Sequence, residues 1–256
     1  MGMERIESAN NKIIKLVSSL KIRKYRKEEG LFVAEGERLV VDGMKYLHPE
    51  FIIVSESYKE KNFPVKTYEI SDNLFKKISE TVTPQGIIGV FKTQIKNEED
   101  IPLKNTLILN RLQDPGNLGT ILRTAKACGF QNIIVDNECV DIYNPKTVRS
   151  SMSACFSLDI FSSQDIKATA ERLKTKGFTL AGCVLDSDAK NLYSQELKTP
   201  VAFIIGNEGS GISEELKGLC DIKIIIPMEE GIESLNASVA ASVVMYEFLR
   251  REKYEI

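Results

Sequence analysis

Short apolar runs alternate with helical patterns from residue 107 onward, and this alternation constrains the fold more than any other feature of the sequence. Runs of strand length stand at residues 107–109, 132–135, 156–161, 178–185, 201–205 and 222–226. Helical patterns follow at 118–128, 145–154, 165–176, 212–219 and 234–249. Strands separated by helices pair in parallel and are covered on both faces. The second half therefore predicts an α/β fold with a mainly parallel sheet between helices.

The first half of the chain predicts a smaller α/β unit. A helix capped by Asn10 or Asn11 runs to Leu20, and a basic run continues to Lys27. Strands are expected at 31–34, 51–54, 65–70 and 87–91, with further helices opening near Gly36 and at Ser71. The polar stretch at 93–104 is broken by a proline and is typical of a connection. We therefore predict a first domain at residues 1–96, a linker at 97–104 and a second domain at 105–256.

Composition excludes several classes of protein. No apolar run approaches the roughly 20 residues that a membrane span needs, and the N-terminus lacks the apolar core of a signal peptide. The five cysteines are widely spaced without a CxxC pair, which indicates a reducing cytoplasm rather than a zinc site or a disulfide framework. His48 is the only histidine, so we predict no metal site and no Ser-His-Asp catalysis.

Two of the apolar runs deliver unusual loops at their C-terminal ends. Residues 206–211 carry three glycines, so the backbone there can turn sharply or approach a ligand. Pro227 stops the run at 222–226, and Ser234 then has the features of an N-cap for the last helix. Loops at the C-terminal ends of neighbouring parallel strands form ligand sites in open α/β sheets. The sequence therefore predicts a small-molecule site for a nucleotide-like ligand.

Polar residues near these loops have ordinary structural explanations as well as functional ones. Asn117 can cap a helix and Arg123 can form a surface ion pair, yet a helix N-terminus with an arginine beyond it also suits phosphate. Glu208 can be a solvated loop carboxylate. Ser234 and Asn236 can serve the helix that follows. No G-x-G-x-x-G dinucleotide fingerprint or Walker-type phosphate loop is present.

Taken together, these residues resemble the three motifs of the SpoU (TrmH-type) RNA ribose methyltransferases, part of the SPOUT superfamily. The matching runs are Asn117-x-Gly119-x-x-x-Arg123, Gly206-Asn207-Glu208-Gly209-x-Gly211, and Ile226-Pro227-Met228 with Glu233-Ser234-Leu235-Asn236. Upstream, Phe32-Val-Ala-Glu35-Gly36 and Pro84-Gln85-Gly86-Ile87 resemble the N-terminal substrate-binding domain of that family. The resemblance covers nearly the whole chain.

The resemblance implies a fold and an activity. The expected fold is a parallel sheet covered by helices with a C-terminal trefoil knot, preceded by a small α/β/α sandwich domain. The expected activity is S-adenosylmethionine-dependent methylation of a ribose 2′-hydroxyl in structured RNA, with ribosomal RNA favoured over transfer RNA. Such enzymes are homodimers. Cytoplasmic location and the absence of a membrane partner complete the expectation.

Residue roles follow from the same resemblance. The implied cofactor-binding positions are Leu185, Gly206, Asn207, Gly209, Gly211, Ile226, Met228 and Leu235. The implied catalytic positions are Asn117, Arg123, Glu208, Ser234 and Asn236. Family proposals make the residue at Arg123 the base that activates the hydroxyl. An arginine with a pKa above about 12 is a reluctant base, so phosphate binding is our preferred role.

The stretch from Ser8 to Lys27 contains basic residues and no acidic ones, and it suits either a solvated helical face or contact with RNA phosphates. The candidate contacts are Lys12, Lys15, Arg23, Lys24 and Arg26. The alternatives to a ribosomal RNA methyltransferase are a non-catalytic RNA-binding or ribosome-assembly factor with the same fold, a tRNA-directed or base-directed methyltransferase, and a nucleotide-dependent oxidoreductase. Cofactor binding and the identity of the methylated nucleoside distinguish them.

Overall fold

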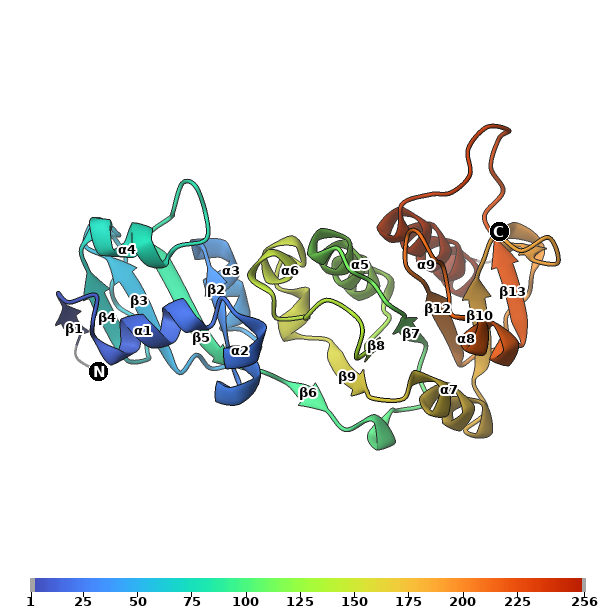
Figure 1. Ribbon diagram of the computed structural model, residues 1–256, viewed down its shortest axis with the longest axis horizontal. Coiled ribbons are helices and arrows are strands. Elements are labelled where there is room, and N and C mark those ends of the chain that lie inside the picture. Colours follow the sequence, from blue (N-terminus) through green and yellow to red (C-terminus); the bar gives the residue numbers. More distant parts are fainter. Residues whose placement is uncertain (1–2, 255–256) are drawn as a thin grey trace. The chain divides into compact units, whose positions relative to one another are not determined.

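The computed structural model describes residues 3–254, which form two compact units (Figure 1). Unit 1 comprises the chain up to Gln94 together with Asp141–Ser157, and unit 2 comprises Ile95–Val140 together with the chain from Leu158 onward. Compactness thus places one segment, 141–157, with the N-terminal residues, although the sequence assigned it to the second domain. The domain limits expected from the sequence stay a prediction.

Unit 1 is built on a five-stranded sheet in the order β1-β4-β3-β5-β2. β5 is antiparallel to both of its neighbours, whereas β1, β4 and β3 are parallel to one another. The strands are β1 (Met3–Ile6), β2 (Leu31–Glu35), β3 (Phe51–Ser55), β4 (Thr67–Ile70) and β5 (Ile87–Lys92). The helices are α1 (Lys12–Ser19), α2 (Arg23–Glu29), α3 (Glu37–Gly43), α4 (Asp72–Ile78) and α6 (Pro145–Ser150).

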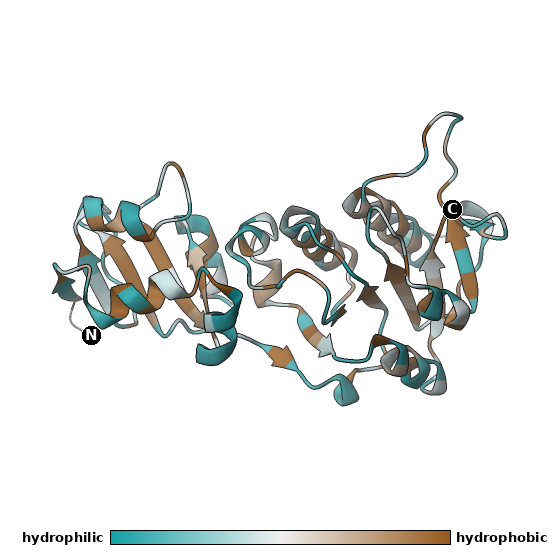
Figure 2. Cartoon of the chain, viewed as in Figure 1, coloured by the Kyte–Doolittle hydropathy of each residue, from teal (hydrophilic) through white to brown (hydrophobic). Residues whose placement is uncertain are grey.

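Helices cover both faces of this sheet because its strands are apolar on both sides. Ile53 and Val90 belong to the core shared with α1 and α4, and α1 contributes Ile14 and Val17 to it. On the other face, the ring of Phe32 stacks on Tyr143 with centroids 4.4 Å apart. Figure 2 shows the central strands β3 and β5 mainly in brown and much of the helical surface around them in teal. Burial on both faces explains the near-continuous apolar runs of these strands.

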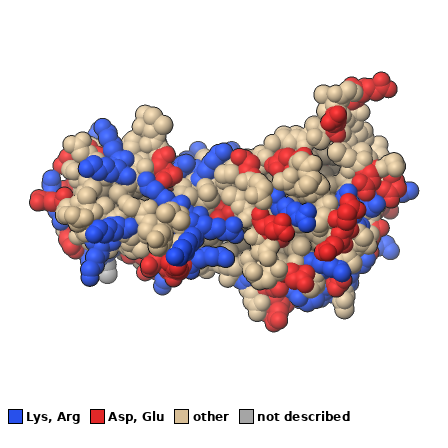
Figure 3. Space-filling model, viewed as in Figure 1, with Lys and Arg blue, Asp and Glu red and all other residues tan. Residues whose placement is uncertain are grey.

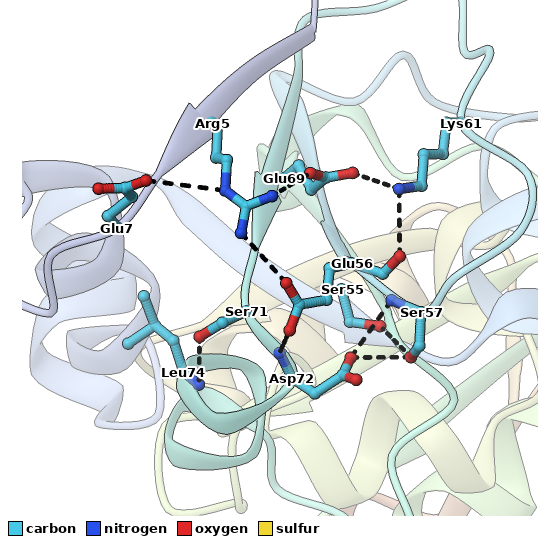
Figure 4. Close-up of polar contacts among 10 residues, drawn as sticks. All are labelled: Arg5, Glu7, Ser55, Glu56, Ser57, Lys61, Glu69, Ser71, Asp72 and Leu74. Atoms are coloured by element: carbon cyan, nitrogen blue, oxygen red, sulfur yellow. Dashed lines mark hydrogen bonds and ion pairs between the residues drawn. The ribbon is translucent and has the colours of Figure 1, made fainter.

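A polar network fastens the edge strand β1 (Figure 4). Arg5 on β1 donates to Glu69 on β4 and to Glu56 after β3, each over 3.1 Å. Lys61 pairs with the other oxygen of Glu69, and this lysine together with Arg5 lowers the pKa of that carboxyl below its usual value. Asp72 accepts from the Ser57 hydroxyl over 2.8 Å. The network therefore supplies charge pairs where β1 has little apolar burial of its own.

Unit 2 is built on an eight-stranded sheet in the order β11-β13-β10-β12-β7-β8-β9-β6, and every pairing in it is parallel. Its strands are β6 (Ile95–Lys96), β7 (Thr106–Leu109), β8 (Asn132–Asp136), β9 (Asp159–Ser163), β10 (Thr179–Cys183), β11 (Lys190–Asn191), β12 (Val201–Ile205) and β13 (Ile222–Ile225). Its α-helices are α5 (Pro115–Cys128), α7 (Ile166–Thr175), α8 (Glu214–Leu219) and α9 (Ala237–Tyr254).

Alternate side chains of β12 show how this sheet is covered. Ala202 and Ile204 belong to the core that includes Leu173 of α7 and Leu216 of α8. Phe203 points the other way and packs against Phe248 of α9 with ring centroids 5.5 Å apart. α5 packs against α9. The mainly parallel sheet between helices, predicted from the alternation of patterns, is confirmed.

Some boundaries differ from those expected. α6 ends at Ser150 because Met152 and Ser153 have left-handed φ angles of 48° and 71°, which no right-handed helix accommodates. Phe156 consequently lies in a 3₁₀ helix, and the strand expected from residue 156 begins at Asp159. β6 lies just before the expected linker, within the polar stretch at 93–104, and it pairs with β9 of unit 2. In the described part of the chain, no helix is both long and apolar enough to cross a membrane.

Candidate functional site

A pocket of about 510 Å³ opens at the C-terminal ends of β10, β12 and β13 in unit 2. Three loops line it, one after each strand, together with the start of α9. All of the cofactor positions implied by the sequence line this pocket: Leu185, Gly206, Asn207, Gly209, Gly211, Ile226, Met228 and Leu235. Because the strands are parallel and adjacent, segments far apart in sequence meet at one edge of the sheet.

The glycine loop, residues 206–212, keeps its shape through its own hydrogen bonds. The side-chain oxygen of Asn207 accepts from the backbone N–H groups of Gly209 and Ser210 over 2.8 and 3.1 Å. Asn207 and Gly211 also exchange two backbone hydrogen bonds. A Cβ atom at Gly206 would lie 2.2 Å from the carbonyl carbon of Gly211. The tight closure of the loop therefore requires glycine at position 206.

The loop after β13 leads into α9, and Asn236 rather than Ser234 caps that helix. The side-chain oxygen of Asn236 accepts from the backbone N–H of Ser238 over 2.9 Å and from that of Val239 over 3.3 Å. The expected cap at Ser234 is therefore wrong, because the helix begins at Ala237. Ser234 is exposed and lines the pocket instead.

Three of the expected catalytic residues form a hydrogen-bonded chain. Asn117 donates through its amide nitrogen to Glu208, and Asn236 donates to the side-chain oxygen of Asn117 over 3.0 Å. The Asp114 carboxylate, not Asn117, caps α5, which places Asn117 in the first helical turn with its side chain free for this role. These hydrogen bonds connect α5, the glycine loop and the start of α9, and each of the three motifs contributes one residue.

Arg123 stands apart from this chain. It is exposed on α5, two turns from the helix start, and it does not line the pocket. Its assignment as base or phosphate ligand stays a prediction.

Sequence reasoning missed a charged cluster at the pocket. Asp186, in the loop after β10, pairs with Lys223 of β13 over 3.0 Å and with Lys217 of α8 over 3.4 Å. Hydrogen bonding from Lys223, with help from Lys217, lowers the pKa of the Asp186 carboxyl. Both Asp186 and Lys217 line the pocket. In the sequence, only Asp186 and Asp188 after Leu185 could have indicated this cluster. Lys217 and Lys223 lie more than thirty positions from Asp186, so the ion pairs leave no local pattern.

The expected RNA contacts divide into two groups. Lys12 and Lys15 on α1, and Arg23 and Lys24 on α2, are exposed. Figure 3 shows Lys and Arg side chains gathered over the part of unit 1 where α1 and α2 lie. Arg26 contradicts its assignment because it is only 3% exposed.

Each nitrogen of the Arg26 guanidinium has a partner inside unit 1. It binds the Asp141 carboxylate through Nε at 2.7 Å and Nη2 at 2.6 Å, and it donates through Nη1 to the Leu20 carbonyl at 2.7 Å. A helical position in a basic run does not reveal which residues face inward. Arg26 is therefore a structural residue, and its burial keeps the guanidinium away from RNA.

Comparison with known proteins bears on the pocket and on unit 1. The SpoU rRNA Methylase family matches residues 104–246, and an MRM3-like substrate binding domain matches residues 11–89. The chain is 31% identical to the 23S rRNA (guanosine(2553)-2′-O)-methyltransferase RlmP of Bacillus subtilis, over 95% of this chain and 98% of that protein.

Solved structures are similar over nearly the whole chain. An rRNA methyltransferase from Sinorhizobium meliloti superposes with a TM-score of 0.87 at 25% identity, covering 98% of each chain. The SpoU methyltransferase AviRb from Streptomyces viridochromogenes, in complex with the cofactor AdoMet, superposes with a TM-score of 0.85 at 25% identity, covering 96% of this chain and 99% of that one.

Proposed function

Because the chain belongs to the SpoU rRNA methylase family, we propose that it transfers a methyl group from S-adenosylmethionine to the ribose 2′-hydroxyl of a nucleotide in ribosomal RNA. The observation that carries this proposal is that the loops with the second and third motifs line one pocket, and that Asn117 of the first motif is hydrogen-bonded to Glu208 and Asn236 beside it. The relative RlmP is named for 2′-O-methylation of 23S rRNA, and AviRb has been solved with AdoMet.

The residues of the pocket fit S-adenosylmethionine. A volume of about 510 Å³ lies in the usual range for ligand pockets. The glycine loop presents backbone rather than side chains on one side, and Gly206 leaves no space for a Cβ. Backbone at Gly206, Ile226 and Leu235 would hold the adenosine, with Leu185 and Met228 supplying apolar contact. S-adenosylmethionine supplies a methyl group on a positively charged sulfur, which an oxygen nucleophile attacks in line.

The chain's own residues supply the alignment that such a transfer needs. Holding two reactants in the correct geometry can account for much of the rate enhancement of an enzyme. Asn117, Glu208 and Asn236 restrain one another, so each presents a fixed polar group at the edge of the pocket. Arg123 binds the phosphate of the target nucleotide and so orients its 2′-hydroxyl. Ser234 contributes a hydroxyl at the pocket rim.

Unit 1 docks the RNA. Lys12 and Lys15 on α1, with Arg23 and Lys24 on α2, offer exposed cations to the phosphate backbone. Reversing the charge of Lys12, Arg23 and Lys24 should lower RNA affinity and flatten its dependence on salt, while the affinity for S-adenosylmethionine stays unchanged. Filter binding across a salt series measures the RNA affinity and its salt dependence. An unchanged slope of log affinity against log salt concentration contradicts this docking surface.

We further propose a knotted, homodimeric enzyme in a reducing cytoplasm. The chain passes from β10 to β12 on one side and then returns to β13 on the other side of β10, which is consistent with a threaded C-terminal segment. Val239 and Tyr246 are exposed, seven residues apart on one face of α9, and so offer apolar surface to a second copy. The five cysteines are thiols rather than disulfides, which suits a reducing compartment.

The decisive experiment incubates the protein with radiolabelled S-adenosylmethionine and ribosomal RNA, followed by nucleoside analysis. A 2′-O-methylnucleoside is expected. A ring-methylated nucleoside would contradict the proposed position, and methylation of transfer RNA alone would contradict the proposed substrate. Calorimetry separates catalysis from a purely structural RNA-binding role, because an assembly factor that never binds S-adenosylmethionine gives no heat.

A matched variant sharpens the test. Asn117→Ala removes the link between Glu208 and Asn236 and should lower the methylation rate about 100-fold, since small displacements of aligned groups have effects of that size. Its affinity for S-adenosylmethionine should stay close to that of the parent protein because Asn117 does not line the pocket.

A further inference from the structure

We propose that Asn110 is the positioning residue that fixes the glycine loop for S-adenosylmethionine, although Asn110 does not itself line the pocket. This inference rests on the proposed function and adds a residue outside the three motifs. Asn110 directly follows β7 and is 2% exposed. A polar side chain buried to this degree needs partners for both its donor and its acceptor.

Asn110 holds both ends of the loop. Its backbone N–H donates to the carbonyl of Ile205, the residue before the loop, over 2.9 Å. Its side-chain oxygen accepts from the backbone N–H of Ser213, the residue after the loop, also over 2.9 Å. Asn110 therefore sets the distance between Ile205 and Ser213, the residues on either side of the glycine loop.

The other half of the Asn110 amide is fixed by Asp136. The amide nitrogen donates to the Asp136 carboxylate over 2.6 Å, and Asp136, at the end of β8, is 5% exposed. The same carboxylate accepts from the backbone N–H groups of Arg111 and Glu138 over 2.8 and 2.9 Å. Three donors thus hold Asp136 rigidly, and Asp136 in turn determines which way the Asn110 amide faces.

Arg111 provides a third attachment. Its carbonyl accepts from the side-chain nitrogen of Asn207 over 3.0 Å, inside the loop. Arg111 adopts a φ of 59°, a left-handed conformation that is unfavourable for a residue with a side chain. The bonds from its N–H to Asp136 and from its carbonyl to Asn207 hold it there. Backbone strain is therefore maintained at the point where the loop is anchored.

The chemistry of position 110 is specific to an amide. Ser213 needs an acceptor and Asp136 needs a donor, and asparagine supplies both from one side chain. An aspartate at 110 would place a second carboxylate where the amide nitrogen now meets Asp136, so two negative charges would face each other in a buried site. Asn110→Asp should therefore disturb the loop more than Asn110→Ala does.

The test compares Asn110→Ala with a control at Asn105, at the opposite end of the paired strands β7 and β12. Asn105 precedes β7, and its side-chain oxygen accepts from the backbone N–H of Val201 over 3.1 Å. Asn105→Ala thus removes the same type of bond without touching the loop. Asn110→Ala should raise the calorimetric Kd for S-adenosylmethionine about tenfold, the size expected for losing one well-placed hydrogen bond and the order it imposes. Asn105→Ala should leave this Kd unchanged, and RNA affinity should be unchanged in both variants.

Exchanging the amide and the carboxylate between positions 110 and 136 should partly restore S-adenosylmethionine binding. Adding Asp136→Asn to Asn110→Asp restores one donor and one acceptor between the two positions, so the double variant should bind S-adenosylmethionine more tightly than Asn110→Asp alone. A double variant that binds no more tightly than Asn110→Asp would contradict the proposed pairing of positions 110 and 136.

Each result decides the matter. An unchanged Kd in a folded Asn110→Ala variant overturns the inference, as does an equal loss in Asn105→Ala. If Asn110→Ala and the milder Asn110→Ser both fail to fold, the network is a determinant of overall stability, and the assigned role is again overturned. If the parent protein itself does not bind S-adenosylmethionine, the proposed function fails instead.

Discussion

Replacing Arg26 by alanine separates a structural arginine from an RNA-binding one. The side chain is 3% exposed, and its partner Asp141 has a side chain that is 18% exposed. The change leaves Asp141 without its counter-charge and the Leu20 carbonyl without its donor. Breaking a buried pair by removing one partner costs roughly 3–5 kcal/mol. For a chain of this length, we expect the thermal unfolding midpoint to fall by roughly 6–20 °C.

Two variants make the measurement specific. Lys24→Ala, two positions earlier on α2, removes a side chain that is 72% exposed and should change stability by less than about 0.5 kcal/mol. The double variant Arg26→Ala with Asp141→Asn should be more stable than Arg26→Ala alone, because the uncompensated charge is then absent.

The assay is thermal or urea unfolding followed by RNA binding at a temperature where all variants are folded. Arg26→Ala should bind RNA as the parent does. An Arg26→Ala protein of unchanged stability and weakened RNA binding would refute the reasoning and restore Arg26 to the RNA surface.

Three further predictions concern unit 2. Gly206→Ala should abolish S-adenosylmethionine binding because the added Cβ would overlap the Gly211 backbone. The control Gly218→Ala, on α8 with open space around its Cβ, should bind normally. Calorimetry that finds equal binding by the two variants would contradict the tight closure of the loop. Arg250 and Arg251 lower the pKa of Glu247 from 4.5 to about 2, so its ionised form stabilises the fold above pH 4.5 and this contribution disappears as the pH falls toward 2. Glu247→Gln should therefore lower the unfolding midpoint at neutral pH and approach the parent's midpoint near pH 2, and parallel pH profiles would be the contrary result. Tyr246→Glu should shift the protein from dimer to monomer in sedimentation, since it charges an exposed apolar face of α9; an unchanged mass would place the interface elsewhere.

Much of the fold follows from local patterns. The strand at 201–205 was predicted to the residue, and those at 51–54 and 87–91 each extend one residue further than expected. These runs are apolar on both faces, so no competing helical period exists. Two helix boundaries differ from the predicted ones, each because of a local conformation that the apolar pattern does not show. The Asp114 cap started α5 three residues early, and the left-handed residues Met152 and Ser153 ended a helical region early.

The pocket illustrates the same division. Its glycine loop, the loop after β13 and the residues Asn117, Glu208 and Asn236 carry recognisable motifs, because the identity of each residue is needed for the local turn or the polar contact. Lys217 and Asn110 belong to no motif. Lys217 matters because it pairs with Asp186, and Asn110 because it accepts from Ser213. Only the order of the strands brings these partners near.

From the amino acids alone came the alternation of strands and helices, the motif loops and the expectation of a methyl-transfer site, since each is written in residues close together in the chain. The three-dimensional arrangement settled which charges face inward, as at Arg26, and which buried side chain anchors the cofactor loop, as at Asn110. The physical reason is that burial and hydrogen-bond partners are properties of contacts between distant segments. An arginine or an asparagine has the same local preferences whether it meets solvent or a buried carboxylate.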